Sequence, residues 1–221
     1  MSHIFDLEPE FLELYEKCRT ETMTSLERMY ALYNATRYIV ANGIAGDFVE
    51  CGVWRGGSVM LIALTLARLG DTGRTLWLYD TFAGMTPPQE IDVQTMSGRP
   101  ARAVLDEDAA NGPFRGIAAR EIAEKNLRGY PNVRFIEGDV LSTIPSFAPP
   151  AIALLRLDTD WYASTRHELE HLYPRVTAGG VLIIDDYGYW SGARKATDEY
   201  FGGNGPLLHR IDYTGRICVK Q

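Results

Sequence analysis

One apolar run that ends in an acidic pair constrains this chain more than any other stretch. Residues 179–187 read GGVLIIDDY, so four large aliphatic residues follow two glycines and lead directly into Asp185 and Asp186. A short, continuous apolar run of this kind is typical of a strand buried on both faces of a parallel sheet. Open α/β sheets bind ligands at the carboxyl ends of their strands, which is where these two carboxylates are expected.

A second run repeats this pattern far enough upstream to leave room for a helical crossover. Residues 151–160 read AIALLRLDTD, so Asp158 and Asp160 follow the apolar residues as Asp185 and Asp186 follow theirs. Two strand ends would then bring up to four carboxylates to one edge of the sheet. Clustered carboxylates repel one another unless a cation is present, so the pattern predicts a metal site.

The length and the net charge of the chain limit the classes of protein to which it can belong. The chain has 221 residues, of which 46% are hydrophobic, and this is enough for one globular domain (residues 1–221) with a sizeable core. Its net charge of −7 disfavours a nucleic-acid partner, because binding to phosphates requires a basic face. The sequence is compatible with a homo-oligomer.

The cysteines and the N-terminus suggest a compartment. Cys18, Cys51 and Cys218 are odd in number and widely spaced, which favours reduced thiols over a disulfide framework or a zinc site. The N-terminus lacks the basic and apolar regions of a signal peptide, and no apolar run approaches the ~20 residues of a membrane span. We therefore expect a cytoplasmic protein without a membrane partner.

The order of the expected elements indicates a doubly wound, mostly parallel α/β sheet of Rossmann-like type. Apolar runs predict five strands at residues 46–53, 75–79, 132–137, 151–157 and 179–184. The helices after the first strand are expected at residues 59–69, 116–128, 164–173 and 192–201. Two further runs, 207–211 and 216–220, flank a turn and predict an antiparallel hairpin at the sheet edge, which makes seven strands.

Two segments lie outside this regular alternation. Helices are expected at residues 8–18 and after a capping box at Thr24 and Glu27, so residues 1–45 form a helical N-terminal extension that covers one edge of the sheet. Residues 84–114 are irregular and rich in proline and charge. A connection of this length predicts a lid or an acceptor-binding loop.

The turn after the first strand has an unusual glycine pattern. Residues 50–58 read ECGVWRGGS, and Gly52, Gly56 and Gly57 do not have the GxGxxG spacing of a dinucleotide-binding turn. The looser spacing suits a ligand that carries a carboxylate and an amine. On this stretch alone, a plain strand–helix turn explains the glycines equally well.

Carboxylates also follow the second and third strands. Asp80 ends the second strand, where a carboxylate can accept both hydroxyls of a ribose. Asp139 follows Gly138 at the end of the third strand, at a place suited to an adenine edge. Either aspartate could instead cap a helix or a turn. Together with Glu50 on the first strand, however, the ordered series favours a nucleotide-like ligand.

Residues 167–171 read HELEH and match the HExxH motif of zinc proteases. That chemistry also requires a third ligand and a helix set in a cleft. This segment follows a strand end and is flanked by charged residues, so we expect an outer crossover helix with solvated histidines.

Four ordered motifs together resemble the macrocin O-methyltransferase family, over about residues 24–220. They read FVECGVWRGGS (48–58), YDTFAGM (79–85), LDTDWY (157–162) and IDDY (184–187). The resemblance implies a class I methyltransferase fold, S-adenosylmethionine as methyl donor, a divalent metal, and sugar hydroxyls of secondary metabolites such as antibiotics as acceptors.

The resemblance also implies roles for individual residues. Asp158, Asp185 and Asp186 correspond to the metal ligands, and Asp160 to a proposed general base. The implied cofactor contacts are Glu50, Gly52, Trp54, Ser58, Asp80, Gly138, Asp139 and Asp158. With Mg²⁺, three carboxylates leave about three of six positions open, enough for two neighbouring hydroxyls and a water. The metal would orient the acceptor and lower the pKa of its hydroxyl, and Asp160 would take the proton.

Several alternatives stay open at this stage. The acceptor could be a non-sugar diol or a catechol-like compound, and the chain could bind the cofactor without turnover. A dehydrogenase or a nucleotide-sugar enzyme on a similar sheet would require the stricter glycine spacing, which is missing. Asp160 could also be the N-cap of the helix expected near Ala163.

Overall fold

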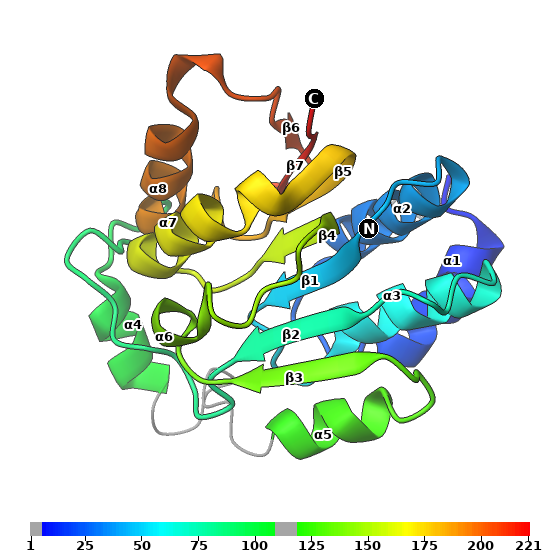
Figure 1. The fold of residues 1–221 in the computed structure, drawn as a ribbon. Coiled ribbons are helices and arrows are strands. Elements are labelled where there is room, and N and C mark those ends of the chain that lie inside the picture. The colour runs from blue at the N-terminus through cyan, green and yellow to red at the C-terminus, as the bar shows by residue number, and fades with distance from the viewer. Residues whose placement is uncertain (1–5, 109–118) are drawn as a thin grey trace.

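The computed structural model describes residues 6–108 and 119–221. Within them, seven strands form one sheet in the order β3-β2-β1-β4-β5-β7-β6 (Figure 1). The strands are β1 (Asp47–Cys51), β2 (Leu76–Asp80), β3 (Val133–Glu137), β4 (Ile152–Leu157), β5 (Val176–Ile184), β6 (His209–Arg210) and β7 (Arg216–Val219). The first five are parallel, and β7 is antiparallel to both β5 and β6. The predicted sheet and its edge hairpin are confirmed.

Helices cover both faces of the sheet (Figure 1). They are α1 (Pro9–Cys18), α2 (Leu26–Ala41), α3 (Gly57–Arg68), α4 (Ala101–Asp108), α5 (Ala119–Asn126), α6 (Val140–Thr143), α7 (Tyr162–His171) and α8 (Ser191–Phe201). Short 3₁₀ turns lie at Tyr173–Arg175 and Gly202–Asn204. Among these, α1, α2, α3 and α5 pack on one face, whereas α6 and α7 pack on the other. The chain order therefore produces the doubly wound arrangement that the sequence predicts.

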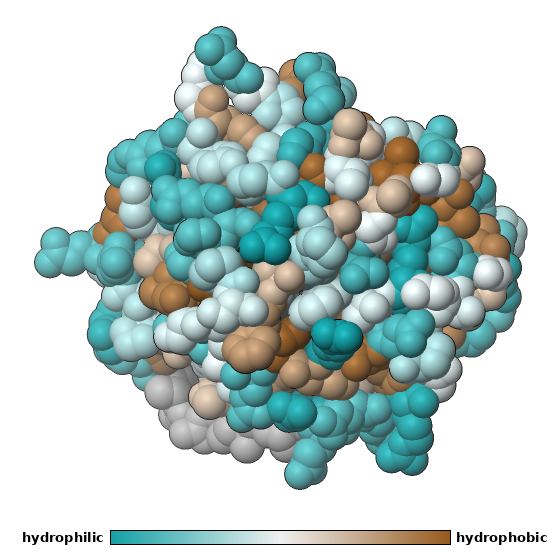
Figure 2. Space-filling view, viewed as in Figure 1, coloured by the Kyte–Doolittle hydropathy of each residue, from teal (hydrophilic) through white to brown (hydrophobic). Residues whose placement is uncertain are grey.

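Strand residues alternate between two apolar cores. Phe48, Leu154 and Ile183 face the core under α1, α2 and α3, whereas the residues that follow them, Val49, Leu155 and Ile184, face the core under α7. This follows from the period of two along a strand. Both sets must be apolar because both faces are covered. In the view of Figure 2, apolar side chains are scattered among hydrophilic ones over the surface.

The N-terminal extension differs from its prediction in two ways. Helices α1 and α2 pack against α3 on a face of the sheet, not along its edge. Ser25, not Thr24, is the N-cap of α2, and its hydroxyl accepts a hydrogen bond of 3.1 Å from the backbone N–H of Arg28. The Ser25 hydroxyl also donates to Asp212 in the distant β6–β7 turn, a tertiary contact that local sequence does not reveal.

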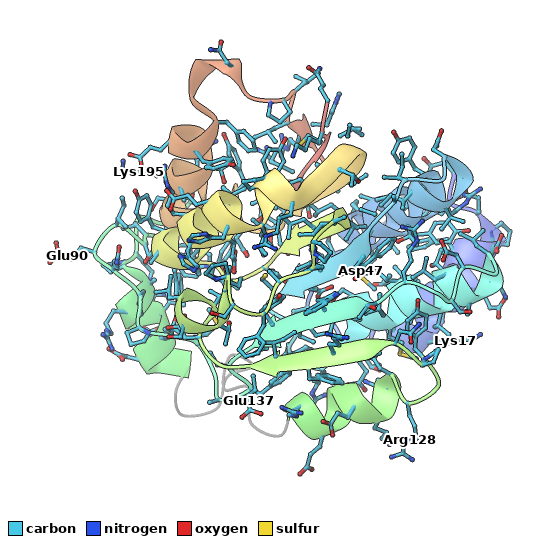
Figure 3. All side chains as sticks on the ribbon, in the orientation of Figure 1. Lys17, Asp47, Glu90, Arg128, Glu137 and Lys195 are labelled. Atoms are coloured by element: carbon cyan, nitrogen blue, oxygen red, sulfur yellow. The ribbon has the colours of Figure 1, made fainter. Side chains whose placement is uncertain are left out.

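The polarity of the sheet is visible in Figure 3. Asp47 lies at the amino end of β1, and Glu137 lies at the carboxyl end of β3. Glu90, in the irregular segment after β2, lies on the same side of the molecule as these carboxyl ends. The strand order reverses between β1 and β4, and ligands of doubly wound sheets bind at such a point. In the described ranges, no helix is both long and apolar enough to cross a membrane.

Candidate active site

A cavity of about 300 Å³ lies at the carboxyl ends of the parallel strands. Nearly all the residues proposed from the sequence line it, with the exception of Glu50. Those in the wall are Gly52, Trp54, Ser58, Asp80, Gly138, Asp139, Asp158, Asp160, Asp185 and Asp186. Residues from five different strand ends therefore meet in one place, which is what the sequence pattern predicts.

The turn after β1 requires glycine at its first position. Gly52 has a φ of +85°, and a Cβ atom there would lie 2.0 Å from the carbonyl oxygen of Asp158. Any side chain would collide with the backbone at the end of β4. The glycine thus lets β1 and β4 approach closely where the cavity forms.

Asp80 holds this turn in place from the end of β2. Its Oδ2 accepts hydrogen bonds from the backbone N–H groups of Val53 (2.7 Å) and Trp54 (2.8 Å). Its Oδ1 accepts another from the N–H of Phe82 at 2.8 Å. A carboxylate offers about four acceptor positions, so these bonds leave about one for a ligand. Asp80 is therefore both a turn aspartate and a wall residue of the cavity.

Asp139 likewise combines two positions. It is the N-cap of α6, where its Oδ1 accepts from the backbone N–H of Leu141 at 2.9 Å, and it also lines the cavity. Gly138 before it has a φ of +136°, in a region that favours glycine. The capping alternative for Asp139 is confirmed, and its role at an adenine edge stays a prediction.

Glu50 lies beneath the cavity rather than in its wall. Its Oε1 is 2.8 Å from Nη1 of the buried Arg156, and it accepts a hydrogen bond from the hydroxyl of Ser58. Burial raises the pKa of this carboxyl above its ordinary value. Glu50 therefore contacts the cavity through Ser58, which does line it. Its direct contact with the cofactor stays a prediction.

The segment between α1 and α2 also forms part of the cavity wall. Residues 21–24 and Arg28 line it, and the carbonyl oxygen of Glu21 accepts a hydrogen bond of 2.9 Å from the N–H of Gly57. This contact is made at the first residue of α3. The N-terminal extension is therefore part of the site.

Three carboxylates gather as the two apolar runs predict. Asp158, Asp185 and Asp186 each offer an oxygen, and these oxygens lie within 4.8 Å of one another. Asp185 and Asp186 are buried, and Oδ2 of Asp186 has no hydrogen-bond partner among the described residues. Burial, followed by repulsion from Asp160 and Asp158, raises the pKa of Asp186 well above its ordinary value. An all-oxygen donor set with an unpartnered buried oxygen fits a hard divalent cation such as Mg²⁺.

Two arginines at this cluster were missed by sequence reasoning. Arg156 on β4 is 1% exposed, and its guanidinium lies 2.8 Å from Oδ2 of Asp158 and 2.6 Å from Oδ1 of Asp185. Arg28 on α2 pairs with the other oxygen of Asp185 and, over 3.1 Å, with Asp212. A single arginine within an apolar strand, such as Arg156, indicates a buried ion pair. The sequence around Arg28 has no comparable pattern.

Asp160 lines the cavity in a left-handed conformation, with a φ of +69°. Its Oδ1 accepts a hydrogen bond of 2.7 Å from Nε1 of Trp190. Burial is the main cause that raises its pKa to about 7, and repulsion from Asp185 contributes. An aspartate with this pKa can exchange a proton near neutral pH.

The alternative of a helix cap for Asp160 is wrong. Helix α7 begins at Tyr162 and its N-cap residue is Trp161, whose own side chain makes no capping hydrogen bond. The N–H of Tyr162 instead donates to Oδ1 of Asp92 at 2.8 Å. Asp92 lies in the irregular segment after β2, so a distant carboxylate takes the capping position.

The irregular segment is held firmly where it is described. The hydroxyl of Ser191 donates to the carbonyl of Ile91 at 2.6 Å and accepts from the N–H of Val93 at 2.9 Å. Nε1 of Trp161 donates to the carbonyl of Thr86 at 2.9 Å. Met85 and Thr86 also line the cavity. The role of residues 84–114 as a lid or acceptor loop stays a prediction, and positions 109–114 lie outside the described residues.

The HELEH segment lies on α7, as expected for a crossover helix. The rings of His167 and His171 are 4.3 Å apart, and Nε2 of His167 lies 2.9 Å from the carbonyl oxygen of Ile144. In the described part of the chain, the group with metal-ligand spacing is the aspartate cluster, not this pair. The histidines are half-buried instead of fully solvated, and Glu168 between them is fully buried and bonded to Thr159.

The model of the macrocin O-methyltransferase (TylF) family matches residues 17–218. The chain belongs to this family. It is therefore an S-adenosylmethionine-dependent methyltransferase, as the sequence motifs implied.

Two relatives illustrate the range of the macrocin O-methyltransferase family. The chain is 35% identical over 218 residues to 8-demethyl-8-(2,3-dimethoxy-alpha-L-rhamnosyl)-tetracenomycin-C 4'-O-methyltransferase of Streptomyces olivaceus. The match covers 95% of this chain and 79% of that protein. It is 31% identical to demethyldecarbamoylnovobiocin O-methyltransferase of Streptomyces niveus, over 81% of this chain and 67% of that protein.

Solved structures agree with this assignment. The O-methyltransferase NovP superposes with a TM-score of 0.76 and 30% identity, over 91% of this chain and 82% of that one. The calicheamicin methyltransferase CalS11 superposes with a TM-score of 0.64 at 18% identity, over 96% and 93% of the two chains, and shows the shared fold. The predicted class I methyltransferase fold is confirmed.

Proposed function

We propose that this enzyme transfers the methyl group of S-adenosylmethionine to a hydroxyl of a sugar in a glycosylated secondary metabolite, with Mg²⁺ at the aspartate cluster. The observation that carries the proposal is the buried Oδ2 of Asp186, which lies beside Asp158 and Asp185 and has no hydrogen-bond partner within the described part of the chain. The tetracenomycin relative is named for an acceptor that carries a rhamnosyl group, and its similarity supports a glycoside acceptor here. We assign the activity to one domain, because the strands of residues 6–108 and 119–221 all belong to one sheet.

The proposed cofactor site lies where the strand order reverses between β1 and β4. The turn at Gly52 and Trp54 would receive the methionine part, and the acceptor position left on Asp80 would bind a ribose hydroxyl. Asp139 would meet the adenine, next to Gly138. Other contacts would come from Ser58, from Glu50 through Ser58, and from Asp158.

The proposed metal site uses three carboxylates of this chain. Asp158, Asp185 and Asp186 would hold the ion, and Arg156 keeps the first two oriented through its ion pairs. When bound, Mg²⁺ would orient the acceptor and make its hydroxyl more acidic. The side chains of the cavity wall would hold the methyl donor and the acceptor in position, and such positioning is a large part of catalysis in transfer reactions.

Asp160 would accept the proton of the reacting hydroxyl. It lines the same cavity as the metal ligands, and its pKa of about 7 suits a general base near neutral pH. Trp190 fixes one of its oxygens, so the carboxyl group is held in a defined orientation.

A screen with radiolabelled S-adenosylmethionine tests the proposal. Glycosides with neighbouring sugar hydroxyls should accept label, whereas the matched deoxysugar glycosides that lack one of these hydroxyls should accept little. Simple catechols serve as the comparison acceptors. Label on catechols but on none of the glycosides would contradict the sugar assignment and favour a non-sugar diol acceptor.

A further inference from the structure

Glu168 is a buried acid that the proposed reaction does not use. It lies in the middle of α7 and is 0% exposed. Its two carboxyl oxygens lie 3.0 and 3.1 Å from Oγ1 of Thr159, which donates to them. Burying a carboxyl group is costly unless it is hydrogen-bonded, so this contact accounts for an acid at a position that faces inward.

Thr159 lies between the two residues whose directions matter most. Asp158 before it is a proposed metal ligand, and Asp160 after it is the proposed base. The carbonyl oxygen of Thr159 accepts from the N–H of Trp161 at 2.8 Å and from the hydroxyl of Ser164 at 3.2 Å. The backbone on one side and Glu168 on the other thus fix this residue.

The conformation of the segment makes such support necessary. Asp160 has a φ of +69°, which residues other than glycine adopt rarely and at an energetic cost. A strained backbone persists only where its surroundings over-determine it. The Glu168–Thr159 contact supports the segment from α7, whereas the Trp190 contact holds the carboxyl group of Asp160 itself.

We propose that Glu168 is a positioning residue, which acts through Thr159 to set the directions of Asp158 and Asp160. This inference rests on the proposed metal-dependent reaction. Partners behind metal ligands typically change metal affinity or activity by roughly 10- to 100-fold when they are removed. Loss of the contact should therefore weaken Mg²⁺ binding and slow methyl transfer while leaving the cofactor turn at Gly52 intact.

Four variants test the contact from both sides. Thr159→Val and Glu168→Leu remove it at similar size, whereas Thr159→Ser and Glu168→Gln keep a hydroxyl and an acceptor oxygen. Calorimetric Mg²⁺ titration should show affinity about 10-fold weaker in the first pair and near wild-type affinity in the second. Affinity for S-adenosylhomocysteine should fall less than Mg²⁺ affinity in the first pair, because Asp158 is only one of several proposed cofactor contacts, and should stay near that of the wild type in the second pair.

A buried threonine elsewhere supplies the matched control. Thr65 in α3 is 1% exposed, and its hydroxyl donates to the carbonyl oxygen of Leu61 in the same helix, so Thr65→Val should lower stability without changing Mg²⁺ affinity. If Glu168→Leu does not fold, Thr159→Val still decides the question. Wild-type Mg²⁺ affinity in Thr159→Val would overturn the positioning role. Absence of Mg²⁺ binding by the wild type would refute the proposed metal site itself, and this role with it.

Discussion

Asp160 accepts a hydrogen bond from the indole of Trp190 over 2.7 Å, and this contact joins the segments that follow β4 and β5. Trp190 is buried and packs edge-on against Trp161, with ring centroids 5.1 Å apart. The carboxyl group of Asp160 is thus held by an aromatic pair instead of by the first turn of α7. A change of its charge should therefore affect the chemistry more than the fold.

Asp160→Asn tests whether the charge of Asp160 serves the reaction and not the stability of the fold. The amide oxygen can still accept from Trp190, so the melting temperature and Mg²⁺ affinity should stay near those of the wild type. Asparagine accepts no proton at neutral pH, and loss of a general base lowers rates by about 10²-fold or more. Single-turnover methyl transfer measures the loss. A rate close to that of the wild type would assign proton removal to a water molecule.

Substitution of Asp185 or of Asp186 by asparagine should shift the melting temperature of the metal-free protein in opposite directions. Oδ2 of Asp186 has no hydrogen-bond partner in residues 6–108 and 119–221, and burial raises the pKa of this carboxyl group. Asp186→Asn should therefore raise the melting temperature of the metal-free protein while weakening Mg²⁺ binding. Both oxygens of Asp185 pair with arginines, so Asp185→Asn removes one carboxylate partner from each of two largely buried guanidinium groups. Breaking a buried pair from one side costs about 3–5 kcal/mol. Thermal unfolding in EDTA compares the two, and shifts of the same sign would contradict this view of the charges.

Gly52→Ala should abolish cofactor binding and strongly destabilise the protein. A Cβ there would lie 2.0 Å from the backbone carbonyl oxygen of Asp158, and the paired strands β1 and β4 cannot accommodate it. Gly70→Ala is the matched control, since Gly70 has a similar φ of +74° with open space around it. Its cost should be only the left-handed strain of about 1–2 kcal/mol. The thermal shift with S-adenosylhomocysteine distinguishes the two variants. Equal shifts in both would show that cofactor binding does not require glycine at position 52.

The buried Glu168 predicts a pH dependence of stability in the metal-free protein. Burial raises its pKa to about 8, above the value of about 4.3 for an exposed glutamate. Its folded form therefore holds a proton that the unfolded form has released. The contribution of protonated Glu168 to the free energy of unfolding is complete below about pH 4 and declines as the pH rises to about 8. In urea unfolding with EDTA, wild-type stability minus that of Glu168→Gln should fall between these values, and a constant difference would contradict the raised pKa.

The sequence predicts the sheet and the part of the cavity wall at the strand ends because both follow from local pattern. Apolar runs that end in Asp80, Asp158 and Asp185 mark buried strands, and parallel strands bring their carboxyl ends to one edge. Side-chain roles that depend on distant segments could not be predicted. Arg28 reaches Asp185 from α2, and Asp92 caps α7 from a segment without regular period.

The HELEH segment shows how a local pattern misleads. Its histidines make it resemble a metal motif, and its charges make it resemble a solvated face. Glu168 nevertheless faces the segment after β4, because α7 packs with that side on the sheet. The direction in which a charged helix residue points is decided by tertiary packing, which spacing in one sequence does not encode.

Metal removal and replacement during methyl transfer tests the central claim most directly. Protein treated exhaustively with EDTA should keep its fold and its thermal shift with S-adenosylhomocysteine, because the cofactor turn at Gly52 and Asp80 needs no metal. Transfer of labelled methyl to an accepted glycoside should fall to background and return when Mg²⁺ is added in excess. Full transfer by the EDTA-treated protein would contradict a metal site at Asp158, Asp185 and Asp186.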